Sequence, residues 1–141
     1  TEAGPYRYAY LDYDGPISNL RKSQRTALDK FTAAKVAAGD TISVILTDPR
    51  AANGKVRAQL GYTLAEGDLI PEGLKEGRIE RRPVVAAKVQ AAVLLAPSKA
   101  YQALSNTLEP QGKTITMPTV ERYRPAGQAS RIGTFTLEMN R

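Results

Sequence analysis

The hydrophobic and polar positions of the first half of the chain predict the order β-α-β-β. Residues 7–13 alternate, as in a strand with one face buried. Apolar residues at helical spacing then predict a helix that begins near Ile17 and ends at Gly39, a C-cap residue type. Residues 41–47 form a β-branched run typical of a buried strand, and residues 55–64 alternate again.

The same order is predicted for the second half, after a crossover segment rich in Gly, Pro and acidic residues at 66–77. Its expected elements are one or two extended segments, a helix and two further strands, at residues 78–93, 98–108, 114–123 and 132–139. The repeat concerns the order of elements, because the two halves share few identical residues.

This repetition predicts a single α+β domain over residues 1–141, with half-modules at about 5–65 and 78–141. The two β-α-β-β modules would be related by a pseudo-two-fold axis. They would form one antiparallel sheet with both helices on one face. The other face is left for a ligand cleft.

The stretch YRYAYLDYDGP concentrates tyrosines on one side of the first strand. Tyr6, Tyr8 and Tyr10 recur every second residue and share a face, whereas Ala9 and Leu11 lie on the opposite face and suit packing under a helix. Buried phenols need hydrogen-bond partners, so the phenol row fits a partly wet surface. It forms either an aromatic cleft wall, which we favour for Tyr8 and Tyr10, or a cross-strand ladder that covers the sheet.

A carboxylate interrupts an apolar strand face in the second half. Glu121 and Tyr123 share that face, and an acid there is costly unless it is paired or wet. One interpretation is an acid that lines the cleft. The other is a strand-end Glu paired with Arg122, Arg124 or Arg131. Tyr123 would stack on a ligand, hydrogen-bond the acid, or simply cover the edge of the sheet.

Two further residues are candidate ligand contacts. Tyr62 stands on the apolar face of its strand and belongs either to the core or to the cleft. Lys88 occupies a position in the second half that corresponds to the tyrosines of the first. It would neutralise an acid such as Glu121, bind an anionic group, or remain a solvated surface residue.

Composition narrows the chemistry. Cysteine and histidine are both absent, which excludes disulfides, thiol catalysis, the usual zinc sites and Ser-His pairs. We expect no metal and no cofactor. The net charge is +6, but the basic residues are scattered and form no nucleic-acid motif, so we expect no nucleic-acid partner. No apolar run is long enough to span a bilayer.

Four segments together carry a resemblance to GyrI-like small-molecule-binding domains. DYDGPISNLRKS resembles their "GPY" strand-to-helix corner, with Ile17 where Tyr is usual, and LIPEGLKEGRIERRPVVAAKVQ resembles their midpoint. APSKAYQAL is similar to their second helix, and MPTVERYRP to their acidic third strand with its Glu-x-Tyr pair. The start, TEAGPYRYAYLDYDGP, resembles a membrane-anchored envelope branch of the family.

The resemblance implies a cleft between the modules that binds a small amphipathic or aromatic molecule, with Glu121 as the functional acid. The ligand-binding residues would be Tyr8, Tyr10, Glu121, Tyr123, Tyr62 and Lys88. One alternative is hydrolysis of a strained electrophile, with Glu121 activating water. Another is an envelope protein-interaction module. The absence of Trp implies a shallower pocket than is usual.

The resemblance also sets expectations for the protein's setting. The first residue is Thr, and we expect an anchor upstream of it as the sole contact with a membrane. The location would be the cell envelope or periplasm, or otherwise the cytoplasm. We expect a monomer or weak dimer.

Overall fold

The computed structural model describes residues 1–48, 54–93, 95–125 and 132–141. The helices of this part are α1 (Leu20–Ala34) and α2 (Ala96–Leu108), with single 3₁₀ turns at Ile17–Asn19 and Glu109–Gln111. Its strands are β1 (Glu2–Ala3), β2 (Tyr6–Pro16), β3 (Thr41–Ile45), β4 (Lys55–Thr63), β5 (Lys75–Ile79), β6 (Arg82–Ala92), β7 (Thr119–Pro125) and β8 (Ile132–Asn140).

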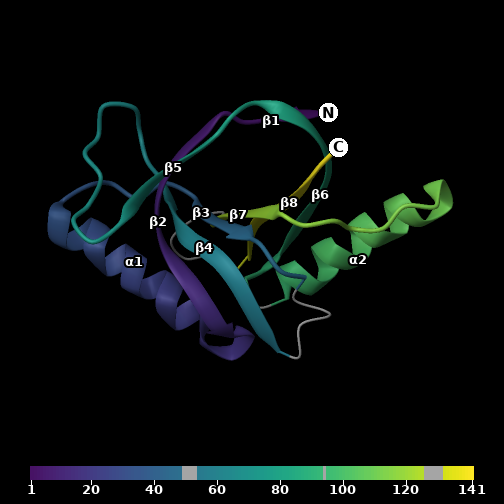
Figure 1. The fold of residues 1–141 in the computed structure, drawn as a ribbon, viewed down its shortest axis with the longest axis horizontal. Coiled ribbons are helices and arrows are strands. Elements are labelled where there is room, and N and C mark those ends of the chain that lie inside the picture. The colour runs from purple at the N-terminus through teal and green to yellow at the C-terminus, as the bar shows by residue number, and fades with distance from the viewer. Residues whose placement is uncertain (49–53, 94, 126–131) are drawn as a thin grey trace.

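The described strands form one antiparallel sheet in the order β1-β6-β8-β7-β3-β4-β2-β5. The first module supplies β2-β4-β3 and the second supplies β6-β8-β7, so β3 and β7 meet at the centre. Helix α1 packs on β2 and β4, and α2 packs on β6 and β8 (Figure 1). The predicted α+β fold, with two repeated modules and both helices on one face, is confirmed.

The short strands β1 and β5 tie the modules together reciprocally. β1 precedes β2 in the chain but pairs with β6, whereas β5 precedes β6 but pairs with β2. The pairs Ala3↔Arg82 and Tyr6↔Ile79 keep the same register, so both pairings belong to one antiparallel ribbon. The ribbon arches over the sheet in Figure 1, and the sheet curls beneath it.

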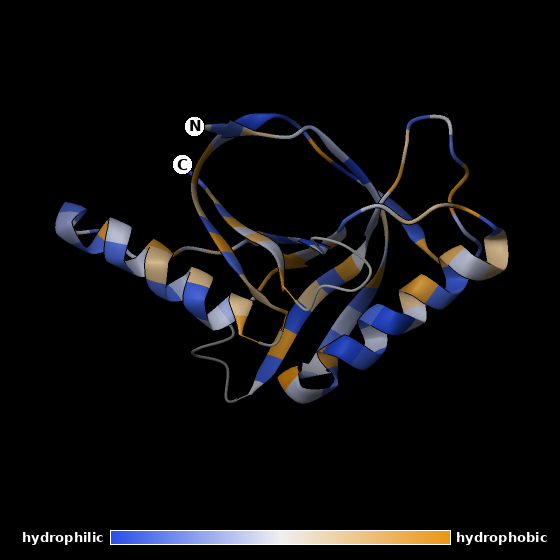
Figure 2. Cartoon of the chain, turned by 180° about the vertical axis from the view of Figure 1, so that it is seen from behind, coloured by the Kyte–Doolittle hydropathy of each residue, from blue (hydrophilic) through white to orange (hydrophobic). Residues whose placement is uncertain are grey.

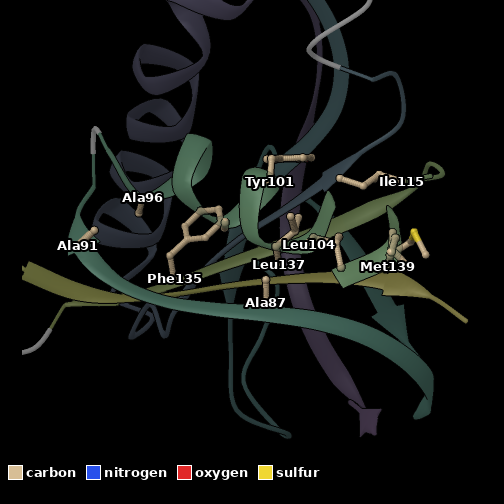
Figure 3. Packing of buried hydrophobic residues seen from close by; sticks show 11 residues of the cluster. Ala87, Ala91, Ala96, Tyr101, Leu104, Ile115, Phe135, Leu137 and Met139 are labelled. Carbon is tan, nitrogen blue, oxygen red and sulfur yellow. The ribbon is translucent and has the colours of Figure 1, made fainter. Parts of the chain in front are cut away.

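The helix face holds apolar clusters in both modules. Ala9 packs with Ala27 and Phe31 of α1, and Leu137 packs with Leu104 of α2 (Figure 3). Coloured by hydropathy, the helices and strands show both hydrophobic and hydrophilic positions along their length (Figure 2), which is the pattern of elements with one buried side. The predicted placement of Ala9 and Leu11 beneath the first helix is confirmed.

The opposite face, which we call the concave face, holds a buried ionic network. Glu138 is 1% exposed and accepts hydrogen bonds from the Tyr6 hydroxyl at 2.5 Å and from Arg122 at 3.0 and 3.2 Å. Arg82 lies 3.0 Å from its other oxygen, at ion-pair distance but without hydrogen-bond alignment. The Arg122 guanidinium also lies over the Tyr6 ring, 4.7 Å from its centre.

Several predicted boundaries differ from the structure. Helix α1 ends at Ala34 because Lys35 takes a left-handed conformation, and the chain leaves the helix before Gly39. The crossover segment contains the start of β5, which finds a partner in β2. The strand predicted from residue 114 begins at Thr119, since Pro118 has no amide to donate to a ladder. The turn-forming residues at 53–54 and 125–127 fall largely outside the described residues.

We predict that Glu138→Gln destabilises the domain by about 3 kcal/mol or more, because Arg82 and Arg122 lose their buried counter-charge. The urea unfolding midpoint measures this change. The matched control is Glu76→Gln, which removes a carboxylate that pairs with Arg7 and Arg78 at the surface, and it should change the midpoint little. Equal midpoints for the two variants would contradict a structural role for the network.

Candidate functional site

The middle of the helix face carries a group of polar side chains. Neither helix packs along β3 or β7, but each extends a side chain over them. Gln24 of α1 reaches Ser43 of β3, and Tyr101 of α2 reaches Thr119 and Glu121 of β7. We call these five residues the central strip. It lies where the two modules meet, because Ser43 and Glu121 are register partners.

Glu121 is the only ionisable carboxylate of the strip and has neutral neighbours. It is partly buried, and one carboxylate oxygen accepts a hydrogen bond from the Tyr101 hydroxyl at 2.8 Å. It makes no ion pair with any Lys or Arg that the structure describes. Burial raises the pKa of the Glu121 carboxyl to about 7, although the Tyr101 hydrogen bond opposes the shift. The group therefore titrates near neutrality.

Tyr101 is positioned as a neutral donor beside this acid. Its hydroxyl lies 2.9 Å from Thr119 Oγ1, and Figure 3 shows it at the edge of the apolar cluster of α2. Burial, with smaller contributions from Glu121 and Asp48, raises the pKa of the phenol well above its usual value. Tyr101 therefore stays protonated while Glu121 changes charge.

The first module contributes a matching polar pair. Ser43 donates a hydrogen bond to Gln24 Oε1 at 3.3 Å, and Gln24 Nε2 donates to the Gly61 carbonyl at 2.6 Å. The amide of Gln24 is thereby held over β3. The strip therefore combines hydrogen-bonding groups from the first module with a carboxylate from the second.

The predicted pairing of the tyrosine row with Glu121 and Tyr123 is wrong, because the sheet lies between them. Tyr8, Tyr10 and Lys88 are on the concave face, whereas Glu121 and Tyr123 are on the helix face. Alternation along one strand tells which of its residues share a face. Which of the two sets lies under the helices depends on the register between neighbouring strands.

Tyr8 is packed more tightly than a partly wet cleft wall would be. It is 4% exposed, its hydroxyl donates to Gln59 Oε1 at 2.6 Å, and its ring lies 5.4 Å from that of Tyr10. The ring covers Gly77, where an added Cβ would lie 2.3 Å from it. Burial raises the pKa of Tyr8 to about 12.

Tyr62 and Tyr123 occupy the helix face as packing residues. The Tyr62 ring meets Phe31 of α1 edge-on at 5.7 Å between ring centres. Tyr123 packs against the cluster of α2, and its hydroxyl donates to the Ala91 carbonyl at 3.4 Å. Their predicted role as ligand contacts stays a prediction.

The arginines that follow Glu121 do not neutralise it. Arg122 pairs with Glu138, and Arg124 makes two 3.0 Å hydrogen bonds to Asp40, both on the concave face. Arg131 lies outside the described residues. Lys88, predicted as one possible counter-charge, is also on the concave face, so it does not reach Glu121.

Sequence reasoning missed Tyr101 as a partner of Glu121 and missed the Glu138 network entirely. Tyr101 falls on the apolar stripe of its helix, a position typical of a core residue, and most of its ring does lie in the core. A signal for Glu138 was present, because a single carboxylate between Leu137 and Met139 interrupts a strand that is otherwise apolar or hydroxylic.

Two comparisons with known proteins found nothing: no family model matches the chain, and no curated protein does. Solved structures do match. One is a cryo-EM structure of an EcmrR–DNA complex, with a TM-score of 0.71 and 12% identity over 99% of this chain. Another is SAV2435 bound to tetraphenylphosphonium, with a TM-score of 0.67 and 10% identity, also over 99% of this chain.

These likenesses show the fold. The chain spans 55% of the EcmrR chain and 90% of the SAV2435 chain. Within the part of the chain that the structure describes, no helix is both long and apolar enough to cross a bilayer. The same residues contain no cluster of three or more acidic side chains that would hold a metal ion.

We predict that the ionisation of Glu121 makes the wild type less stable than Glu121→Gln as the pH rises. The folded pKa of about 7 exceeds the ordinary 4.5, so the folded state holds its proton longer than the unfolded state does. Stability relative to the Gln variant should therefore fall between pH 4.5 and pH 7. The difference should reach about 3 kcal/mol, measured by urea unfolding across this range.

The matched control for this pH series is Glu109→Gln, an exposed acid just beyond the end of α2. Its stability difference from the wild type should not follow the same pH window. A pH-independent difference between wild type and Glu121→Gln would contradict the raised pKa.

Proposed function

We propose that this chain is a GyrI-like small-molecule-binding domain whose ligand binds at the central strip and carries a positive charge. The observation that carries the proposal is Glu121, a partly buried carboxylate held by a neutral phenol and by no described cation. This carboxylate can form an ion pair with a positively charged ligand, whereas an acid that is already paired with Lys or Arg cannot do so without losing that partner.

The electrostatics of the strip favour a cation over an anion. An ionised Glu121 in a partly buried place is stabilised by an opposite charge, and binding would lower its raised pKa. The tetraphenylphosphonium bound by SAV2435, a protein of the same fold, is a ligand of this chemical type.

We predict that tetraphenylphosphonium binds this domain and that Glu121→Gln weakens its binding about tenfold or more, the loss expected for one charged contact. Isothermal titration calorimetry measures both affinities. Affinity for the wild type should rise as the pH is increased through about 7, because Glu121 becomes ionised. The Gln variant should show no such rise.

The matched control is again Glu109→Gln, which should bind the cation like the wild type. A second variant, Tyr101→Phe, removes the hydroxyl that contacts Glu121 while it keeps the ring. Equal affinity of wild type and Glu121→Gln for the cation would count against the central strip as the site.

Hydrolysis of a strained electrophile is a second candidate, favoured by one specific feature. A carboxylate with a pKa of about 7 can take up or release a proton at neutral pH, and the Tyr101 hydroxyl beside it can donate to developing negative charge. The strip would then bind the substrate, and Glu121 would activate water.

For this candidate we predict that release of product from a cyclopropane-containing electrophile follows the ionisation of Glu121. The rate should rise through about pH 7, and Glu121→Gln should lower it by about a hundredfold or more, the usual contribution of a general base. Liquid chromatography of the reaction mixture measures turnover. Turnover that survives in the Gln variant would exclude Glu121 as the base, while leaving ligand binding intact.

A further inference from the structure

The concave face holds a second polar site, separated from Glu121 by the thickness of the sheet. A cavity of about 320 Å³ opens there, lined by Asp40, Lys88, Gln90, Arg122, Arg124, Thr134 and Thr136. Three of the lining side chains are basic and one is acidic. This size is at the lower end of the range of small-molecule sites.

Strand pairing arranges the lining residues in two rows across β6, β8 and β7. Lys88 pairs with Thr136, and Thr136 pairs with Arg122. One step along the strands, Gln90, Thr134 and Arg124 form the second row in the same way. Directly opposed side chains on one face start about 5 Å apart. Each row therefore has a hydroxyl in the middle, and the first row has a cation on either side of it.

The acidic groups near the cavity are already engaged with the arginines. The Asp40 carboxylate accepts two 3.0 Å hydrogen bonds from Arg124, and Glu138 binds Arg122. Neither reaches Lys88, which makes no ion pair with any residue that the structure describes. Within the same described residues, the hydroxyls of Thr134 and Thr136 make no side-chain hydrogen bond. The cavity thus presents a cation and two hydroxyl donors.

We propose that this cavity binds a small organic anion through its phosphate or carboxylate group, held over Thr136 between Lys88 and Arg122. Lys88 supplies the uncommitted charge. The planar guanidinium of Arg122 is fixed by Glu138 and supplies hydrogen bonds in a set direction. Thr134 and Gln90 would donate to hydroxyl or further oxygen atoms of the ligand.

The geometry makes the site independent of the cation site proposed above. Glu121 and Arg122 are consecutive residues of β7 and point to opposite faces of the sheet. Glu121 belongs to the central strip, and Arg122 belongs to the cavity. Binding of an anion on the concave face does not require the central strip to be occupied. Failure of one proposal would leave the other standing.

The test is a titration of the 141-residue chain with inorganic phosphate and, separately, with citrate. Sodium chloride keeps the ionic strength constant. Backbone amide shifts in a two-dimensional NMR spectrum report where each anion binds. We expect saturable shifts centred on Lys88, Thr134 and Thr136. Lys88→Gln should weaken binding about tenfold, as expected for the loss of one charged hydrogen bond.

The matched control is Lys99→Gln, which removes an exposed lysine of α2 on the other side of the sheet and should leave binding unchanged. Thr136→Val keeps the side-chain shape, removes the central hydroxyl and should weaken binding without moving the unfolding midpoint much. If only citrate binds in a Lys88-dependent way, the ligand group that the cavity recognises is a carboxylate. If only phosphate does, that group is a phosphate. Shifts that do not saturate, or equal losses in Lys88→Gln and Lys99→Gln, would overturn the proposal.

Discussion

The Glu138 carboxylate is the point at which four strands meet. Tyr6 comes from β2, Arg82 from β6, Arg122 from β7, and Glu138 itself from β8. In the order of the sheet, β2 and β8 are separated by three strands, so their contact is possible only because the sheet curls. A carboxylate buried to this degree is costly unless its partners are all in place. The network therefore specifies the curl as well as stabilising it.

The curl divides the molecule into two electrostatic environments. On the concave face, carboxylates are bound by arginines and one lysine remains without an ion pair among the described residues. On the helix face, the partner of Glu121 among the described residues is a phenol. Strand β7 contributes to both environments, because its odd-numbered residues face the helices and its even-numbered residues face the interior of the curl. The concave face thus holds a lysine, and the helix face a carboxylate, that makes no ion pair with a described residue.

Much of the fold was predictable because it depends on local patterns. The alternation in β2 and β4 and the helical stripe of α1 are properties of short segments, and the order of elements in the first half follows from them. The resemblance placed a functional acid at Glu121, and the structure leaves that acid without a described cation. The alternation of side chains along a strand also correctly placed Tyr8 and Ala9 on opposite faces of the sheet, and likewise Lys88 and Val89.

What could not be predicted depends on contacts between distant segments. Whether Tyr8 and Glu121 lie on the same face of the sheet depends on three successive pairings, β2 with β4, β4 with β3, and β3 with β7. A shift of one residue in the register of any of these pairings would place them on the same face. The partners of Glu138 lie up to 132 residues away along the chain. The pairing of β5 with β2 was hidden for the same reason, because its sequence is rich in charge and glycine and has no pattern of its own.

The exchange of β1 and β5 between the modules has a consequence for how the two halves depend on each other. Each module lends its leading strand to the outer edge of the other, as two subunits do in a strand-swapped dimer, except that here one chain supplies both. A half expressed by itself would expose the backbone of its outermost strand and would invite another strand to pair there. Two copies of one half could satisfy each other in this way. The present architecture thus has the connectivity of a strand-swapped homodimer whose two subunits are joined in one chain, with an acid from one module and an amide from the other at the shared seam.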